Sequence, residues 1–247
     1  NNETIYADHI ICNCSPTTAY SKLIKAKDLP KSAIKRTNAR TFGARSACVY
    51  LGLNRSVSDL KINDYSVIIT SSSDSTEQFE KMKTIENNDA IVATCLNIAN
   101  PDCSPQGTTI LKLTTFYTDN CWADVAPEEY FNEKNLLAAR LISKYEKATG
   151  ITIHNYVEEI EISTPVTFAR YTASPQGVTR GYFASEWDSL LPRIMTEETD
   201  NDIKGLRFCG GWATQLDGIC SAVVTGRNTA FATLEDISEE RGVSSEQ

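Results

Sequence analysis

A strand, turn and helix pattern near the end of the chain most restricts what it can fold into. The largely apolar stretch Leu206–Cys209 is typical of a short buried strand, and Gly210 and Gly211 end it in a turn. Gly218 then opens a helix of small residues with no proline and no charge before Arg227. A glycine turn beside a helix start gathers free N–H groups and the positive end of the helix dipole. The sequence therefore predicts a site for an anion or the polar edge of a ring.

This segment resembles the C-terminal flavin-contacting motif of the phytoene desaturases, carotenoid isomerases and retinol saturases, in the amine oxidase superfamily of FAD-dependent enzymes. The family pattern is a short strand, two small residues, a loop, and a Gly-Ile step that begins a small-residue helix. Asp217, Gly218 and Ile219 match that step, and Thr225–Ala230 matches the helix end. Amine oxidases carry an acid where this chain has Gly211, so the carotenoid branch fits better. The alternative is an ordinary strand, turn and helix of any α/β protein.

Further segments resemble the same family in the same order along the chain. Each is a weak signal alone, and the shared order carries the resemblance. They are the strand motif Tyr6–Pro16, the helix Thr17–Leu29, the apolar strand Ser46–Leu53, and Ser163–Thr167 followed by Arg170, Tyr171, Gly177 and Gly181.

The resemblance implies FAD as the cofactor, with contacts at Gly210, Gly211, Trp212, Asp217, Gly218 and Ile219. The Gly210–Trp212 turn would approach the pyrophosphate and ribityl chain, and the helix start would face the pyrimidine edge or ribityl oxygens. Asp217 could instead cap its own helix, and Trp212 could belong to the core. A flavin ring carries its own chemistry, so no catalytic side chain is assigned, and the cysteine and histidine spacing indicates no metal site.

The nucleotide-binding fingerprint Gly-x-Gly-x-x-Gly of that family is absent from the 247-residue sequence, which also begins without Met. We therefore expect the C-terminal half of an FAD enzyme, with the FAD-binding half in a missing N-terminal segment or a companion chain. By resemblance, residues 1–15 and 201–234 belong to the FAD-binding domain and residues 16–200 form the substrate-binding domain. Residues 235–247 are expected to be a flexible acidic tail.

The expected fold class is α+β, with a mixed or antiparallel sheet and helices in the substrate domain and the closing strand and helix of a Rossmann-like FAD domain. Residues 5–13 and 206–209 should be neighbouring strands of one small sheet. Asp28–Arg45 is expected to be a solvated loop, although the resemblance would bring it near the substrate cavity. A helix from Ala126 should break near Asn132. Further strands are expected at 46–53, 65–70, 91–97, 108–117 and 151–162. Helices are expected at 17–26, after Asp74 and after Gly218. The helix from Ala126 should resume after its break and continue through Lys147, with Gly150 as its stop.

The composition limits the partners. The net charge of −8 argues against nucleic acid, which requires basic surfaces. No apolar run approaches the roughly 18–20 residues that span a bilayer, so membrane association is expected only peripherally. Most of the eight cysteines are expected to be buried thiols, which favours a cytoplasmic or organellar reducing compartment. The acids Glu158, Glu159 and Glu161 fit a solvated strand face better than acid/base catalysis.

The expected function is hydride exchange at a C–C bond of a hydrophobic small molecule, a polyene or similar lipid, by desaturation, saturation or isomerisation. This chain by itself is expected to be inactive. The alternative is a non-catalytic binding or partner module that keeps the fold without the nucleotide-binding half. A third possibility, a flavin amine oxidase, is disfavoured by the missing acid at Gly211.

Overall fold

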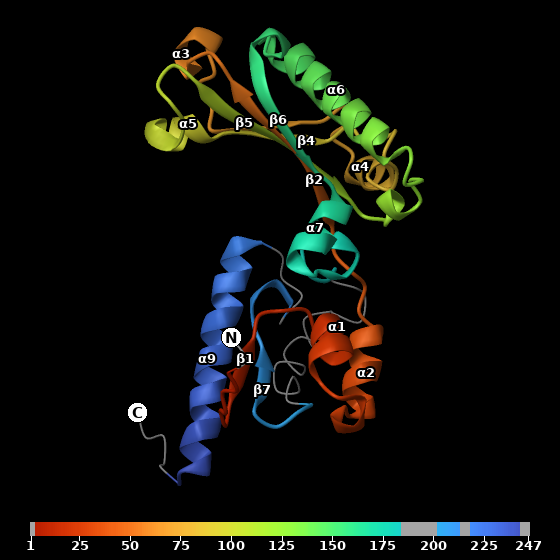
Figure 1. The fold of residues 1–247 in the computed structure, drawn as a ribbon, viewed down its shortest axis with the longest axis vertical. Helices are drawn as coiled ribbons and strands as arrows, with labels where there is room; N and C mark the ends of the chain where they lie inside the picture. Colours follow the sequence, from red (N-terminus) through yellow and green to blue (C-terminus); the bar gives the residue numbers. More distant parts are fainter. Residues whose placement is uncertain (1–2, 184–201, 213–217, 243–247) are drawn as a thin grey trace. The chain divides into compact units, whose positions relative to one another are not determined.

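The computed structural model describes residues 3–183, 202–212 and 218–242. The chain divides into two compact units, which are described separately: a central unit of residues 44–178 and a terminal unit of residues 1–43 and 179–247. Both combine helices with strands (Figure 1), and one sheet is antiparallel while the other is parallel. The fold class is therefore α+β, as predicted.

The central unit is built on a five-stranded antiparallel sheet with the strand order β3-β4-β5-β2-β6. Its strands are β2 (Arg45–Leu53), β3 (Ser66–Ile69), β4 (Ile91–Cys95), β5 (Thr109–Tyr117) and β6 (Val157–Ser163). Its helices are α3 (Val57–Leu60), α4 (Ser75–Lys81), α5 (Leu96–Ala99), α6 (Tyr130–Thr149) and α7 (Pro165–Thr172), with 3-10 turns η3 (Pro101–Cys103), η4 (Cys121–Ala123), η5 (His154–Tyr156) and η6 (Pro175–Gly177).

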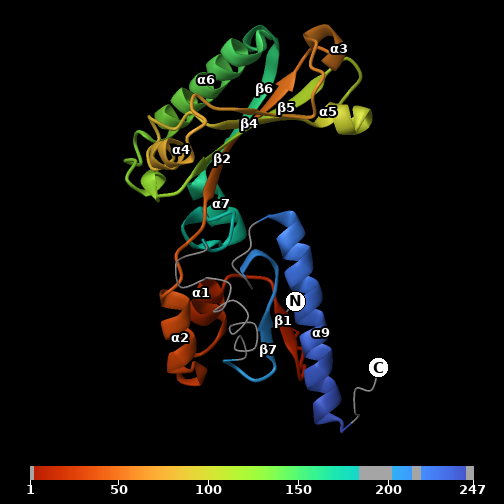
Figure 2. The ribbon, with the colours of Figure 1, turned by 180° about the vertical axis from the view of Figure 1, so that it is seen from behind.

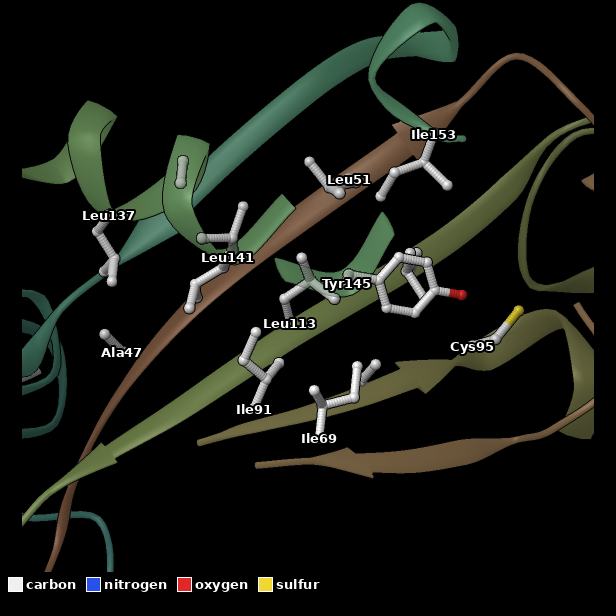
Figure 3. Close-up of a cluster of buried hydrophobic side chains, with 14 of the residues drawn as sticks. Ala47, Leu51, Ile69, Ile91, Cys95, Leu113, Leu137, Leu141, Tyr145 and Ile153 are labelled. Atoms are coloured by element: carbon white, nitrogen blue, oxygen red, sulfur yellow. The ribbon is translucent and has the colours of Figure 1, made fainter. Parts of the chain in front are cut away.

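One face of this sheet carries the main core. Successive side chains on a strand point to opposite faces, so Val49 and Leu51 of β2 lie on the same side as Leu113 of β5, with which Val49 is paired. Leu141 and Tyr145 of α6, four residues apart, pack against these strand side chains (Figure 3). All five are almost fully buried, so the long helix and the sheet share one apolar interior.

Helix α6 runs unbroken from Tyr130 to Thr149, so the predicted break near Asn132 is wrong. Asn132 lies on the solvent side of the helix, where its side chain donates to Glu129 Oε2 at 3.3 Å and leaves the backbone ladder intact. The predicted stop at Gly150 is confirmed: its φ of 74° is in the left-handed region, and its N–H donates to the Glu146 carbonyl at 2.8 Å.

The last predicted strand of this unit is shorter than expected, because β6 begins only at Val157. The carboxylate of Glu146, on α6, accepts the N–H groups of Ile153 and His154 at 2.6 and 2.8 Å. Those groups are therefore used on the helix side rather than in the sheet. Glu158, Glu159 and Glu161 are exposed, in agreement with a solvated strand face.

The terminal unit contains a parallel pair of strands, β1 (Ile10–Cys12) and β7 (Leu206–Phe208), in register from Ile10 opposite Leu206 to Cys12 opposite Phe208. The prediction that these distant segments are neighbouring strands is confirmed. Helix α9 (Ile219–Glu240) runs alongside them (Figure 2). The unit also contains α1 (Pro16–Thr18), the π-helical turn η1 (Ala19–Leu23), the 3-10 turns η2 (Ala26–Asp28) and η8 (Gly210–Trp212), and α2 (Lys31–Asn38).

Two expectations for the terminal unit are corrected. Asp28–Arg45, expected to be a solvated loop, contains α2, whose Ala33 is buried and whose Arg36 forms an ion pair with Asp202 at 3.4 Å. The chain beyond residue 234, expected to be a flexible tail, continues α9 to Glu240. Asp236 in this stretch accepts two hydrogen bonds from Arg207, at 2.8 and 2.9 Å, so its charge holds the helix to β7.

The unit boundaries also differ from the predicted domain boundaries. They fall after Gly43 and Val178, not after residues 15 and 200. Residues 16–43 join the terminal unit because Ala19 and Tyr20 pack against Phe208. The assignment of either unit to flavin or substrate stays a prediction.

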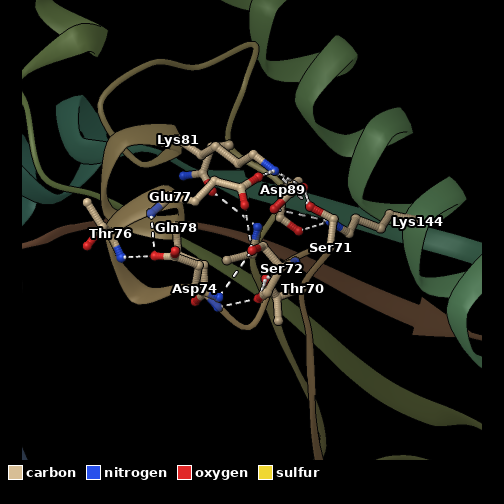
Figure 4. A network of polar contacts seen from close by, with 12 residues as sticks. Thr70, Ser71, Ser72, Asp74, Thr76, Glu77, Gln78, Lys81, Asp89 and Lys144 are labelled. Atoms are coloured by element: carbon tan, nitrogen blue, oxygen red, sulfur yellow. Dashed lines mark hydrogen bonds and ion pairs between the residues drawn. The ribbon is translucent and has the colours of Figure 1, made fainter.

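A polar network fastens α4 to α6 in the central unit (Figure 4). Asp89 lies between two ammonium groups, with Lys81 Nζ at 3.4 Å and Lys144 Nζ at 3.5 Å, and it also accepts from the Ser71 hydroxyl. Burial alone would raise the pKa of Asp89, but the Ser71 hydrogen bond and the two lysines outweigh it and hold the pKa below its usual value. The negative charge of Asp89 therefore offsets the repulsion between the ammonium groups of Lys81 and Lys144.

Replacing Asp89 by Asn should destabilise the chain in a pH-dependent way. Because the folded-state pKa is lowered, the contribution is complete above about pH 4, the unfolded value. It is lost as the pH falls through the lower folded-state value. Urea unfolding followed by circular dichroism should show a loss of about 1 kcal/mol at neutral pH. The exposed Glu158→Gln variant is the control, and a wild-type advantage over Asp89→Asn that persists undiminished at pH 3 would contradict the assignment.

The core prediction concerns Leu141. Leu141→Ala should cost about 2–5 kcal/mol, because it removes buried methyl groups between α6 and the sheet and leaves a cavity. The control is Ile68→Ala, on a side chain that is 74% exposed, with an expected cost below about 0.5 kcal/mol. Equal unfolding midpoints in urea for the two variants would show that α6 does not close this core.

Candidate functional site

The predicted cofactor-binding turn lies at the carboxyl ends of β1 and β7. Parallel strands end at the same edge, so Asn13 after β1 meets Gly210 after β7. Gly210 has a φ of 75°, and a Cβ atom there would lie 2.1 Å from Oδ1 of Asn13. Only glycine permits this approach, so the buried Gly210 packs directly against the end of β1 at the edge where ligands of open parallel sheets bind.

Trp212, at the end of the turn, belongs to an aromatic cluster. Its ring lies edge-on to Tyr182 with centroids 5.1 Å apart and to Phe42 at 6.4 Å, while Phe42 and Tyr182 stack at 5.9 Å. Trp212 is half-buried, and Tyr182 is almost fully buried. Packing against these rings fixes the turn, whatever else Trp212 contacts. Phe42 and Tyr182 were not identified from the sequence, because nothing in it indicates that they approach Trp212.

Gly211 is held by a close backbone approach. A Cβ atom at Gly181 would lie 1.9 Å from the Gly211 carbonyl oxygen, and the Gly181 carbonyl accepts the N–H of Gly43 at 2.7 Å. The glycine that the sequence motif singles out at 181 is therefore required by steric contact with the turn. This contact brings the segments around residues 43, 181 and 211 together.

The start of α9 is the second part of the site. Gly218 occupies the N-cap with a φ of 98°, and no side chain of that residue caps the helix. Ile219 is 85% exposed, so the first turn faces outward. Nη1 of Arg180 lies 3.7 Å from the position of a Cβ atom on Gly218. Asp217 lies outside the described residues.

The electrostatics of this helix start favour an anion or an electron-rich ring edge. The first N–H groups of a helix have no partner within it, and the dipole adds a partial positive charge. The guanidinium of Arg180 lies close to Gly218 at this helix start. Arg180 was missed in the sequence, although a basic residue directly before the motif glycine Gly181 was the available signal.

A hydrogen bond joins the two parts of the site. Thr225 Oγ1 donates to the Gly210 carbonyl at 2.9 Å, and one helical turn later Thr229 Oγ1 donates to the Phe208 carbonyl at 2.9 Å. The helix therefore begins about 9 Å along its axis from the point that contacts the turn, at about 1.5 Å per residue from Ile219 to Thr225. A ligand that used both parts would be elongated.

The central unit contains a separate hollow of about 460 Å³. Val67, Ala93 and Leu111 give it an apolar floor, and Lys61 and Asp64 add polar groups. The volume is within the range of small-molecule sites. The hollow lies wholly within one unit, between α6 and the sheet.

The cysteines are less buried than predicted: of the eight, only Cys48 and Cys95 are buried, and all are free thiols. The expectation that most would be buried is therefore wrong: Cys14 and Cys209 follow strand ends, and Cys103, Cys121 and Cys220 lie in 3-10 turns or on α9. Among the described residues, no group of three or more His, Cys, Asp or Glu side chains is placed to hold a metal ion. Within the same ranges no helix combines the length and apolar character needed to cross a bilayer.

No family model matches the sequence. The chain is 22% identical over 249 aligned positions to a chloroplastic prolycopene isomerase of Daucus carota, which covers 98% of this chain and 37% of that protein. It is 23% identical over 244 positions to the prolycopene isomerase of Arabidopsis thaliana, covering 96% of this chain and 38% of that protein. An oxidoreductase from Methanosarcina mazei aligns in structure with a TM-score of 0.48 and 14% identity, over 93% of this chain and 43% of that one.

The chain thus spans less than two fifths of the curated relatives that it matches. The alignments run through nearly all of this chain, not only through the turn and helix near its end. The chain is therefore similar to prolycopene isomerases over almost its whole length, which confirms the resemblance to the carotenoid-isomerase group that its motifs indicate.

Proposed function

We propose that this chain is the C-terminal half of an FAD-dependent oxidoreductase that acts on C–C bonds of a polyene or lipid-like substrate. The reaction would be desaturation, saturation or isomerisation. One observation carries the proposal: strands β1 and β7, nearly two hundred residues apart, pair in parallel and end together at a glycine turn, with Gly218 at the N-cap of α9 as the second part of the site. The family resemblance predicts this pairing, whereas an unrelated strand, turn and helix does not require it.

The residues at this edge fit a dinucleotide such as FAD. The Gly210–Trp212 turn would approach the pyrophosphate and ribityl chain, with space at Gly211, where a Cβ atom would meet nothing within 4 Å. The start of α9, at Gly218 and Ile219, would face the pyrimidine edge or the ribityl oxygens. Arg180 would add a positive charge where an anion is bound. FAD, when bound, would supply the hydride exchange.

We infer that the missing FAD-binding half, in the same protein or a companion chain, adds strands beside β1. Purely parallel sheets are normally covered on both faces, and two strands alone are marginal. Ile10 and Ile11 of β1 are 56% and 46% exposed, so both faces of this strand still have apolar side chains that a larger layered sheet would cover. The central unit would then meet the hydrophobic substrate. The chloroplastic names of both relatives favour an organellar reducing compartment, with peripheral contact to membrane lipid as the route to a lipid-like substrate.

A second candidate is a binding module that keeps the fold without catalysis. The hollow of the central unit favours it, because that hollow is complete without a nucleotide-binding half. A flavin amine oxidase is a weaker third candidate, because Gly211 occupies the position of the acid in those enzymes.

The first test measures whether flavin binding requires the other half. Titration of residues 1–247 with FAD, followed by flavin fluorescence, should give weak binding or none, because the adenosine contacts would belong to the missing half. The protein from the full open reading frame should retain flavin through purification. Sub-micromolar binding by this chain alone would contradict the proposed division of the site. A full-length protein that folds but never takes up flavin would favour the binding module.

The second test isolates charge at the helix start. Gly218→Glu and Gly218→Gln impose nearly the same bulk and the same backbone strain at a φ of 98°, but only Glu adds negative charge. In the flavin-binding protein, Gly218→Glu should bind FAD more weakly than Gly218→Gln, within a range of about 1–3 kcal/mol.

The control for this pair is Glu159→Gln, on the exposed face of β6, which should bind FAD like the wild type. Circular dichroism should first confirm that all variants fold. Equal flavin affinity of the two Gly218 variants would show that the start of α9 meets no electron-rich part of the cofactor.

A further inference from the structure

Two thiols lie side by side at the end of β1. Cys12 is the last residue of the strand and Cys14 follows one residue later, so both side chains emerge on the same side of Asn13. Their Sγ atoms are 3.2 Å apart and partly accessible. Among the described residues, no other two cysteines are joined by an Sγ to Sγ hydrogen bond.

The backbone on both sides of this pair is fixed. Before it, Cys12 is in register with Phe208, and its carbonyl accepts the N–H of Cys209 at 2.9 Å. After it, Ser15 caps α1 by accepting the N–H of Thr18 at 3.0 Å. The strand and the helix cap therefore hold the backbone that carries the two sulfur atoms.

The protonation state allows this contact. Burial, and then the neighbouring Cys12 thiol, raise the pKa of Cys14 to about 11. Cys14 is thus an uncharged thiol at neutral pH, and it meets its neighbour without the repulsion that two thiolates would produce.

We propose that Cys12 and Cys14 are a reversible dithiol–disulfide pair that exchanges with a small disulfide such as oxidised glutathione. One cysteine, as its thiolate, attacks the small disulfide, breaks its S–S bond and releases one thiol. The second cysteine then attacks the protein-bound sulfur and expels the other thiol. Two protein thiols are oxidised by two electrons, the small disulfide is reduced to two thiols, and each released sulfur takes up a proton that a cysteine has lost.

The geometry needs only a small movement. The sulfur atoms must approach by about 1.2 Å to reach the bond length of about 2.0 Å. A bond across a single intervening residue closes a very small ring, and strained disulfides are more easily reduced. The proposed pair is therefore suited to reversible exchange rather than to permanent stabilisation, and Asn13, between the two cysteines, lies against Gly210.

Trypsin makes this proposal directly testable, because the peptide 1–22 ends at Lys22 and contains Cys12 and Cys14 as its only cysteines. The purified chain, without flavin, is incubated with oxidised glutathione, remaining thiols are alkylated, and the peptides are analysed by mass spectrometry. The expected peptide has lost two hydrogens, carries no alkyl group, and recovers two alkylation sites after dithiothreitol.

Single variants separate closure from simple thiol reactivity. Cys12→Ser and Cys14→Ser should each leave a glutathione adduct on the remaining cysteine, because the second thiol is missing. Cys103→Ser, in the central unit, and Cys209→Ser should still close the pair. A wild-type peptide that ends doubly alkylated, retains a stable glutathione adduct, or is joined to Cys209 would overturn the proposal. None of these outcomes depends on flavin binding, so the test is independent of the proposed function.

Discussion

The parallel pairing of β1 with β7 is the constraint on which the terminal unit depends. It joins residues 10–12 to residues 206–208, so everything between them must leave the strand pair and return to it. The central unit, with its own sheet and core, occupies that interval. Bringing the two ends of such a long segment together costs chain entropy. The burial of Phe208 against Ala19 and the hydrogen bonds of Thr225 and Thr229 on α9 help to offset that cost.

The two units are stabilised by different means. In the central unit, β2 pairs with β5 over nine residues, and the apolar face of α6 packs on the sheet to form a layered core. Ion pairs of Asp89 with Lys81 and Lys144 add an electrostatic contribution. The terminal unit has a much smaller apolar cluster. It relies more on glycine contacts, on hydroxyl hydrogen bonds and on the Arg207–Asp236 pair. Within the described residues the β1–β7 pair has no further strand beside it, which is the condition for adding strands.

The candidate site shows how close packing and electrostatics combine. Glycines at 181 and 210 are required because backbone or side-chain oxygens occupy the places where their Cβ atoms would be. Those contacts fix the turn, and Thr225 fixes the distance from the turn to the helix. Arg180 lies next to the helix start, so residues far apart in the sequence meet at the site.

The sequence by itself determined the local elements: the glycine turn, the Gly150 stop, the helix start at Gly218, and most of the central strands, because these depend on turn chemistry and on short-range patterns. The family-like order of motifs also predicted the β1–β7 pairing. Only the tertiary structure decided the rest. Asn132 does not interrupt α6 because its side chain faces solvent. Helix α2 forms where burial of Ala33 stabilises it. The acidic end of α9 became ordered because Arg207 binds Asp236, and Arg180, Phe42 and Tyr182 reached the site through long-range packing that no local pattern encodes.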